Sequence, residues 1–263
     1  MTMRIVVVCE GPTDVPLVCS LADRVLREHV DWIREQPALD DFRAYVGLEG
    51  ESGYLTWIEV KERFARSGMR LRRYGREKPF PDQVPTHKAL LLIARQHQSA
   101  ADEGGIAGAL IYRDADHQPE RRHGIETARR EFVEPHQALQ SPQQWRQHIA
   151  IAVAEPKNEA WVLAGFVPGD DDEHAALAAA REELGFAPHE TPAELDAREH
   201  GAKRSAKRVL DQLCPDRERR SRCWCETPLD TLRQRGDRCG LAHFLDEVRE
   251  RLVPLFERRR GPA

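Results

Sequence analysis

Two acidic motifs at the ends of apolar segments are the residues of this sequence best suited to chemistry. Glu10 ends the run IVVVC and is followed at once by Gly11 and Pro12, and Asp114 and Asp116 follow the apolar run GALIY as an Asp-x-Asp pair. An Asp-x-Asp pair at the end of a strand is expected to put both side chains on one face, because strand side chains alternate with a period of two. Gly11 has no side chain beside Glu10 and lets a backbone or phosphate group approach closely.

These acids are expected to converge if the segments before them are strands of one parallel sheet. Parallel strands end at the same edge, and a further apolar segment, 148–155, ends on Glu155. Carboxylates gathered without partners repel one another, and a hard divalent cation, Mg²⁺ or Mn²⁺, would relieve that repulsion with oxygen ligands while keeping water for a substrate phosphate. Glu159 is a further ligand in this interpretation, or a first-turn acid favourable to a helix dipole.

Two residues close to these motifs, Asp14 and His117, each have two possible roles. Asp14 is interpreted as the N-cap of the next helix in preference to a support for the site. His117 is read as a surface residue in preference to a metal ligand or a group that orients water. Trp161 is expected in the core. The sequence shows no G-x-S-x-G, P-loop or dinucleotide motif, which argues against esterase, NTPase and dehydrogenase functions.

The elements that must position these residues alternate between strand and helix. Apolar, β-branched runs predict strands, and helical spacing of apolar residues predicts helices between them. The strands are expected at 4–9, 42–49, 107–114 and 148–155, and the helices at 13–30, 54–68, 86–104, 121–133 and 158–166. This alternation predicts an α/β fold with a parallel sheet flanked by helices.

The pattern changes beyond Gly169. Helical stretches are expected at about 173–184, 203–213 and 239–257, without a further strand. The sequence thus predicts an α/β domain over 1–168, with an insertion at about 50–85, and a mainly helical C-terminal region over 169–263.

Basic residues are concentrated in two places. The segment 61–78 holds eight basic residues against two acidic ones, although the whole chain has a net charge of −4. Such a segment can bind phosphates on a mildly acidic protein, or it can be a solvated surface. A second pair, one helical turn apart, precedes an apolar helix face. The candidate nucleic-acid-binding residues are Lys61, Arg63, Arg66, Arg70, Arg72, Arg73, Lys203 and Lys207.

Composition excludes several classes of protein. With 40% hydrophobic and 32% charged residues the chain is expected to fold, and it has no apolar run long enough to span a membrane. Nothing at the N-terminus is typical of a signal peptide, so a cytoplasmic location is expected. Cys214, Cys223, Cys225 and Cys239 have spacings unusual for zinc and are read as reduced thiols, with a zinc site left open.

The motifs VVVCEGPTDVPLV and ALIYRDAD resemble the Toprim family, the catalytic domain of topoisomerases, bacterial primases and the overcoming-lysogenization-defect nucleases. The resemblance covers about residues 4–165. It implies a parallel sheet whose acids bind Mg²⁺ or Mn²⁺ and a general acid or base at Glu10. Glu155 and Glu159, in AEPKNEAWVLAG, look like the element that supplies a second metal site in small stand-alone relatives.

The expected function is metal-dependent cleavage of phosphodiester bonds in DNA or RNA, with Glu10, Asp114 and Asp116 as catalytic residues. The resemblance also implies a role beside an ATPase in phage defence or DNA repair. Two alternatives stay open: a non-catalytic binding or assembly subunit whose helical C-terminal region docks a partner, and a metal-dependent phosphohydrolase of small nucleotides. The sequence also leaves self-association open.

Overall fold

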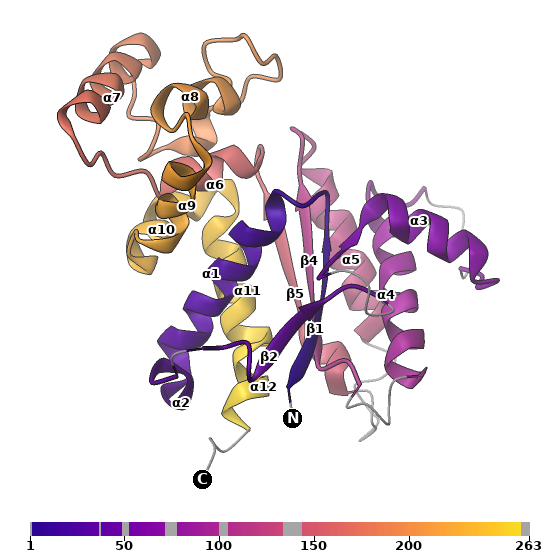
Figure 1. Cartoon of the computed structure of the whole chain (residues 1–263). Coiled ribbons are helices and arrows are strands. Elements are labelled where there is room, and N and C mark those ends of the chain that lie inside the picture. The colour runs from indigo at the N-terminus through magenta and orange to yellow at the C-terminus, as the bar shows by residue number, and fades with distance from the viewer. Residues whose placement is uncertain are drawn as a thin grey trace.

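The strands of the described chain form one parallel sheet (Figure 1). The computed structural model describes residues 2–36, 38–48, 53–71, 78–99, 105–133 and 144–258. The sheet order is β2-β1-β4-β5, and the short β3 also pairs with β1. The strands are β1 (Met3–Cys9), β2 (Arg43–Val46), β3 (Leu55–Thr56), β4 (Gly108–Asp114) and β5 (Ile149–Ala154). The predicted α/β fold with a parallel sheet flanked by helices is confirmed.

Helices connect the strands and make up most of the C-terminal part. Up to β5 they are α1 (Asp14–His29), α2 (Asp31–Arg34), α3 (Trp57–Arg66), α4 (Gln83–Ser99), α5 (Glu120–Val133) and the 3-10 helix η3 (Gln144–Gln147). After β5 they are α6 (Asn158–Ala164), α7 (Asp171–Leu184), η4 (Pro192–Glu194), α8 (Ala206–Leu213), α9 (Arg217–Cys225), α10 (Leu229–Gly236), η5 (Asp237–Cys239), α11 (Leu241–Arg251) and α12 (Val253–Glu257).

Helices cover both faces of the sheet, which explains why β5 and the middle of β1 and of β4 are apolar on both faces. Ile5 and Val7 of β1 point into a core shared with α1 and α11, whereas Val6 and Val8 point into a second core shared with α3, α4 and α5. These two layers lie on opposite sides of the strands in Figure 1. The sheet is therefore held rigidly, and only its edges and strand ends are left for function.

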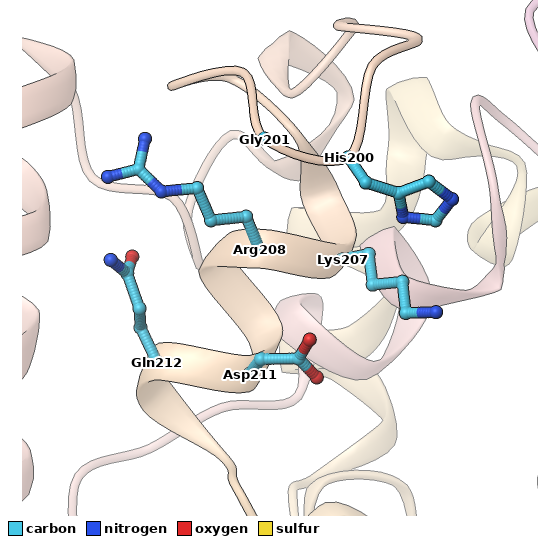
Figure 2. Close-up of a pocket in the computed structure, with 6 residues that line it drawn as sticks. All are labelled: His200, Gly201, Lys207, Arg208, Asp211 and Gln212. Atoms are coloured by element: carbon cyan, nitrogen blue, oxygen red, sulfur yellow. The ribbon is translucent and has the colours of Figure 1, made fainter.

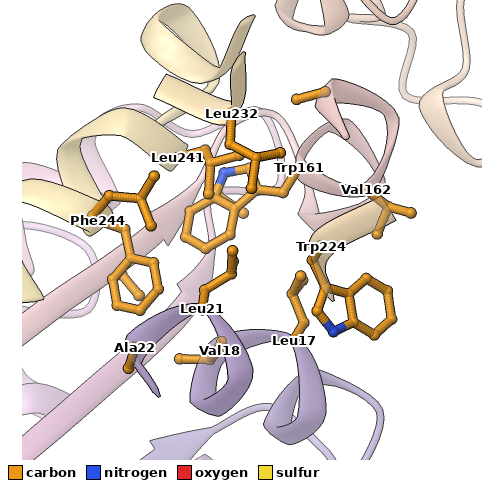
Figure 3. Close-up of a cluster of buried hydrophobic side chains, with 14 of the residues drawn as sticks. Leu17, Val18, Leu21, Ala22, Trp161, Val162, Trp224, Leu232, Leu241 and Phe244 are labelled. Carbon is orange, nitrogen blue, oxygen red and sulfur yellow. The ribbon is translucent and has the colours of Figure 1, made fainter. Parts of the chain in front are cut away.

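The helices of the C-terminal part share the core of the first sheet face. Phe244 of α11 stacks on Trp161 of α6 with ring centroids 5.4 Å apart, and both pack near Leu21 of α1 (Figure 3). The indole of Trp161 donates to the carbonyl of Cys239 at 2.7 Å, so the predicted core position of Trp161 is confirmed.

Two helices of this part, α9 and α10, were not predicted. The sequence of α9, RERRSRCWC, is polar on almost every side and so lacks the apolar period that marks a helix. Its N-cap is Asp216, whose carboxylate accepts a hydrogen bond from the backbone N–H of Arg219 at 2.6 Å. The residue that starts this helix is therefore visible in the sequence even though its periodicity is not.

The outer edge of β5 is satisfied by side chains instead of by another strand. Glu247 of α11 accepts a hydrogen bond from the backbone N–H of Ile151 at 3.1 Å and forms an ion pair with Arg129 of α5. Arg129 also donates to the carbonyl of Ile149 at 3.1 Å. The two charged side chains thus close an edge that would otherwise expose unpaired backbone groups.

No helix in the described ranges is long and apolar enough to cross a membrane.

Removing Glu247 should destabilise the protein strongly. Glu247→Ala leaves the Arg129 charge and the N–H of Ile151 without a partner in a largely buried position, which is expected to lower the free energy of unfolding by about 3–5 kcal/mol. Urea unfolding measures this change. Glu250→Ala, on the exposed side of the same helix, is the control and should change the free energy little. Equal stability of the two variants would contradict this role for Glu247.

Candidate functional site

The two predicted strand-end motifs meet at the carboxyl edge of the sheet. Strands β1 and β4 pair in parallel, with Val8 opposite Ile111, so Glu10, directly after β1, and Asp114, the last residue of β4, lie at adjacent strand ends. The backbone N–H of Asp114 donates to Glu10 Oε1 at 3.1 Å. The structure thus places Glu10 within hydrogen-bond reach of the Asp-x-Asp segment.

Asp114 is held by groups from two elements. Its Oδ1 accepts hydrogen bonds from the hydroxyl of Tyr112 and, at 3.0 Å, from the backbone N–H of Asn158 at the start of α6. Burial raises the pKa of Asp114, the Tyr112 hydrogen bond lowers it, and the charges of Glu10 and Glu159 raise it, with the net result a pKa of about 8. The carboxyl of Asp114 is therefore poorly compensated when it is ionised.

Asp14 supports this edge and does not cap its helix, so the N-cap interpretation of Asp14 is wrong. The N-cap residue is Thr13, without a side-chain hydrogen bond, and Asp14 is the first residue of α1. Asp14 Oδ2 accepts from the N–H of Gly11 at 3.0 Å, and its Oδ1 accepts from the side chain of Asn158 at 2.9 Å. Burial raises the pKa of Asp14 as well. Asp14 therefore ties the turn after β1 to α6.

Asp116 lies in a turn beyond the strand. β4 ends at Asp114, and Asp116 and His117 adopt the left-handed conformation with φ of 48° and 61°. The period-two argument therefore does not apply to Asp116. Its carboxylate pairs with Arg121 Nη1 at 2.9 Å and with Lys157 Nζ at 3.4 Å. Two consecutive residues in this sparsely populated conformation are a feature found mostly at functional sites.

Glu155 and Glu159 differ in their surroundings. The carboxylate of Glu155 is bound by Arg122 Nε at 2.8 Å, and its backbone N–H donates to the carbonyl of Cys239. Within the described part of the chain, no hydrogen bond or ion pair links Glu155 to Glu10, Asp114 or Asp116. Glu159, in the first turn of α6, has a buried Oε2 with no hydrogen-bond partner, and its charge raises the pKa of Asp114 and Asp14.

Sequence reasoning missed the arginines of this edge and the acid that joins them. Arg113 Nε lies 3.4 Å from Glu10 Oε1 and 3.1 Å from Asp82 Oδ2, and Arg121 Nε lies 3.4 Å from the same oxygen of Asp82. Arg113 could have been noticed beside Asp114 in YRDAD. Asp82 carries no local signal, because only the fold brings it to the site.

The predicted nucleic-acid-binding residues lie on two sides of this edge. Lys61, Arg63 and Arg66 are on α3 and Arg70 follows it, whereas Arg72 and Arg73 lie outside the described residues. Lys61 lines a pocket between α3 and α4 together with Trp57, Lys88 and Arg113. The α3 side therefore connects directly to the arginine that pairs with Glu10.

On the other side, Lys203 and Lys207 do not share a helix as predicted. Helix α8 begins at Ala206, so Lys203 lies in the turn before it. Lys207 and His200 extend to the same side of α8 (Figure 2), and both line a small cavity with His117 and Lys157. This cavity joins α8 to the turn that carries Asp116, so Lys207 is close to the acidic edge.

The described residues contain no group of three or more His, Cys, Asp and Glu side chains arranged to hold a metal ion. Asp116 and Glu155 are already paired with cationic side chains. The four C-terminal cysteines do not form such a group either. All six cysteines of the chain are free thiols, and the sulfurs of Cys214 and Cys223 lie 3.9 Å apart. The donor chemistry at the edge nonetheless suits a hard cation, because Glu159 has an orphaned buried oxygen and Asp114 lacks a counter-charge.

The raised pKa of Asp114 predicts a pH-dependent stability. A carboxyl that binds its proton more tightly in the folded protein contributes stability at low pH, and this contribution is lost as pH rises from about 4 to about 8. Asp114→Asn should therefore gain free energy of unfolding relative to the wild type as pH rises from 5 to 8. Urea unfolding of both proteins across this range measures the difference in their free energies of unfolding, and in that difference the contributions of the other titrating groups cancel. A difference that does not change with pH would contradict a neutral Asp114.

Comparison of this chain with protein-family models, with curated proteins and with solved structures found no match. Any statement about function therefore depends on the sequence motifs and on the geometry of this edge.

Proposed function

We propose that the chain is a divalent-metal-dependent nuclease of Toprim type that cleaves phosphodiester bonds of DNA or RNA. The observation that carries the proposal is the gathering of partly buried, under-compensated carboxylates at the carboxyl ends of adjacent parallel strands. Asp114, with its pKa raised to about 8, and Glu159, with an orphaned oxygen, have a local deficit of positive charge. A bound divalent cation would supply that charge.

In this proposal Glu10, Asp114 and Asp116 hold Mg²⁺ or Mn²⁺, with Glu159 as a further donor. These carboxylates would hold the cation, which would supply positive charge to the scissile phosphate and to the attacking and leaving oxygens. Asp116 must exchange its pairs with Arg121 and Lys157 to take part. The backbone N–H of Asp114 keeps Glu10 oriented, and the N–H of Asn158 does the same for Asp114. The site is thereby largely pre-organised by backbone groups.

The surrounding basic side chains suit a polyanionic substrate. Lys61, Lys88 and Arg113 lie along the pocket on the α3 side, and Lys157, Arg198 and Lys207 lie around the cavity on the α8 side. Arg198 and Lys207 form no ion pair with any residue in the described ranges, so their charges are available to phosphates. A strand that crosses the acidic edge would meet cationic groups both before and after the scissile bond.

One observation favours the second candidate, a non-catalytic subunit whose acidic edge is structural. Asp116 and Glu155 are neutralised by Arg121, Lys157 and Arg122, as in a structural ion-pair network. A phosphohydrolase of small nucleotides needs the same acids but not both basic sides. A role in phage defence or DNA repair and an ATPase partner are proposed from the sequence resemblance alone. A cytoplasmic location is proposed from the N-terminal sequence, which is not typical of a signal peptide.

Cleavage assays separate these functions. We expect the wild type to cut labelled single-stranded DNA, duplex DNA or RNA with Mn²⁺ or Mg²⁺ and not with EDTA. Asp114→Asn should reduce the rate by at least about 100-fold, because it removes a carboxylate that would hold the metal ion at the scissile phosphate. Gel analysis of the products measures the rate.

The control for this assay is Asp23→Asn. Asp23 is also a partly buried aspartate. It is bound to Arg43 at the start of β2, away from the carboxyl ends of the strands. It should keep wild-type cleavage. Hydrolysis of small phosphoesters without cleavage of polynucleotides would favour the phosphohydrolase. An absence of hydrolysis with every substrate and metal would favour the non-catalytic subunit.

The two basic sides should contribute separately to binding. Lys61→Gln and Lys207→Gln are each expected to weaken oligonucleotide binding and to make log Kd less dependent on log salt by roughly 0.7–0.9, the effect of one lost phosphate contact. Fluorescence anisotropy at several salt concentrations measures this slope. Arg34→Gln on α2, at the opposite end of the molecule in Figure 1, should leave it unchanged. Three equal slopes would exclude these sides as the interface.

A further inference from the structure

Asp82 binds two arginines, Arg113 and Arg121, that also pair with acids of the edge. Its Oδ2 lies 3.1 Å from Arg113 Nε and 3.4 Å from Arg121 Nε. Arg113 is also 3.4 Å from Glu10, and Arg121 is also 2.9 Å from Asp116. Each guanidinium is therefore shared between Asp82 and one carboxylate of the edge.

The backbone fixes Asp82 in this position. Asp82 adopts the left-handed conformation with φ of 60°, and its carbonyl accepts hydrogen bonds from the N–H and the hydroxyl of Thr86 at 3.0 and 2.7 Å. The same turn lies directly on α5: a Cβ at Gly124 would come within 1.9 Å of the carbonyl oxygen of Pro81. An aspartate held in a strained turn against the helix that carries Arg121 has a fixed distance to both arginines.

This sharing keeps the arginines in place when their other partners change. The side chains of Glu10 and Asp116 are partly exposed and can turn away from the arginines, to a cation or to solvent, whereas Asp82 still holds both Arg113 and Arg121. The N–H groups that Arg113 and Arg121 no longer donate to Glu10 and Asp116 can then bind a phosphate. Arginine suits this anion because its planar guanidinium presents several donors.

We propose that Arg113 and Arg121 form a phosphate-binding subsite for the backbone of a nucleic acid, and that Asp82 is the positioning residue that holds them open for it. This rests on the proposed function, because it takes a polynucleotide as the substrate.

The arginines can be reached from solvent. Arg113 lines the pocket between α3 and α4 with Lys61 and Lys88, and its guanidinium lies 5.3 Å from the centre of the Trp57 ring. The side chains of Glu10 and Asp116 are 34% and 39% exposed, so the edge between the two arginines is open. The side chains of Arg113 and Arg121 are themselves 20% and 15% exposed, so part of each guanidinium faces this open edge.

Oligonucleotide binding to Asp82→Asn tests the proposal. Removing a negative charge would by itself strengthen binding of a polyanion. We expect the opposite, a Kd raised by ~10-fold, because without Asp82 the arginines collapse onto Glu10 and Asp116. The salt dependence should also weaken by roughly one to two units of slope, although no cationic residue has been removed. Fluorescence anisotropy of a labelled oligonucleotide in EDTA measures both without cleavage.

Asp23→Asn is the matched control, and it should bind as tightly as the wild type or slightly more tightly. A tighter or unchanged Kd for Asp82→Asn would overturn the proposal. If Asp82→Asn does not fold, Arg121→Lys replaces it: the positive charge is kept, but a lysine cannot donate to Asp82, Asp116 and the carbonyl of Asp114 together. Its Kd should rise several-fold, and an unchanged Kd would overturn the proposal equally.

The assay in EDTA separates this inference from the nuclease itself. Weakened binding by Asp82→Asn together with no cleavage by the wild type would support the phosphate subsite and refute the nuclease. Cleavage by the wild type together with unaltered binding by Asp82→Asn would support the nuclease and refute the phosphate subsite.

Discussion

The structure depends on one electrostatic constraint, the gathering of negative charge at one edge of a parallel sheet. Because β1 and β4 are adjacent and parallel, Glu10 and Asp114 must follow the strand ends together. Asp14 and Glu159 add further carboxylates from the turns into α1 and α6. Placing these groups in a partly buried position is costly unless each finds a donor or a cation.

The chain meets this constraint with two kinds of partner. Backbone N–H groups of Gly11, Asp114 and Asn158 bind three of the carboxylates, and they fix orientation without adding a full charge. Full positive charges come from Arg113, which pairs with Glu10, and from Arg121 and Lys157, which pair with Asp116. The inner acids, Asp114 and Glu159, are therefore the least compensated, which is the distribution expected where a cation binds.

The segment between β2 and β4 matters more to this edge than its position as an insertion suggests. The indole of Trp57 donates to the carbonyl of Tyr112 at 3.0 Å, and Asp82 holds Arg113 and Arg121. Both contacts reach the last residues of β4 or the helix that follows it. The segment thus packs on one sheet face and also sets the positions of charged groups at the strand ends.

The sequence alone determined four strands of the parallel sheet, its flanking helices and the placing of Glu10 and Asp114 at one edge, because strand runs are local patterns and parallel strands share their carboxyl ends. It did not show the short β3, which falls within a segment predicted as helix. It did not show α9, whose polar helix lacks an apolar period, or that Lys203 precedes α8. Only the tertiary structure decided which partner each acid takes. Asp14 binds Asn158, Glu155 turns to Arg122, and Asp82 joins two arginines 31 and 39 positions away, since such contacts are set by the packing of distant elements and leave no trace in local spacing.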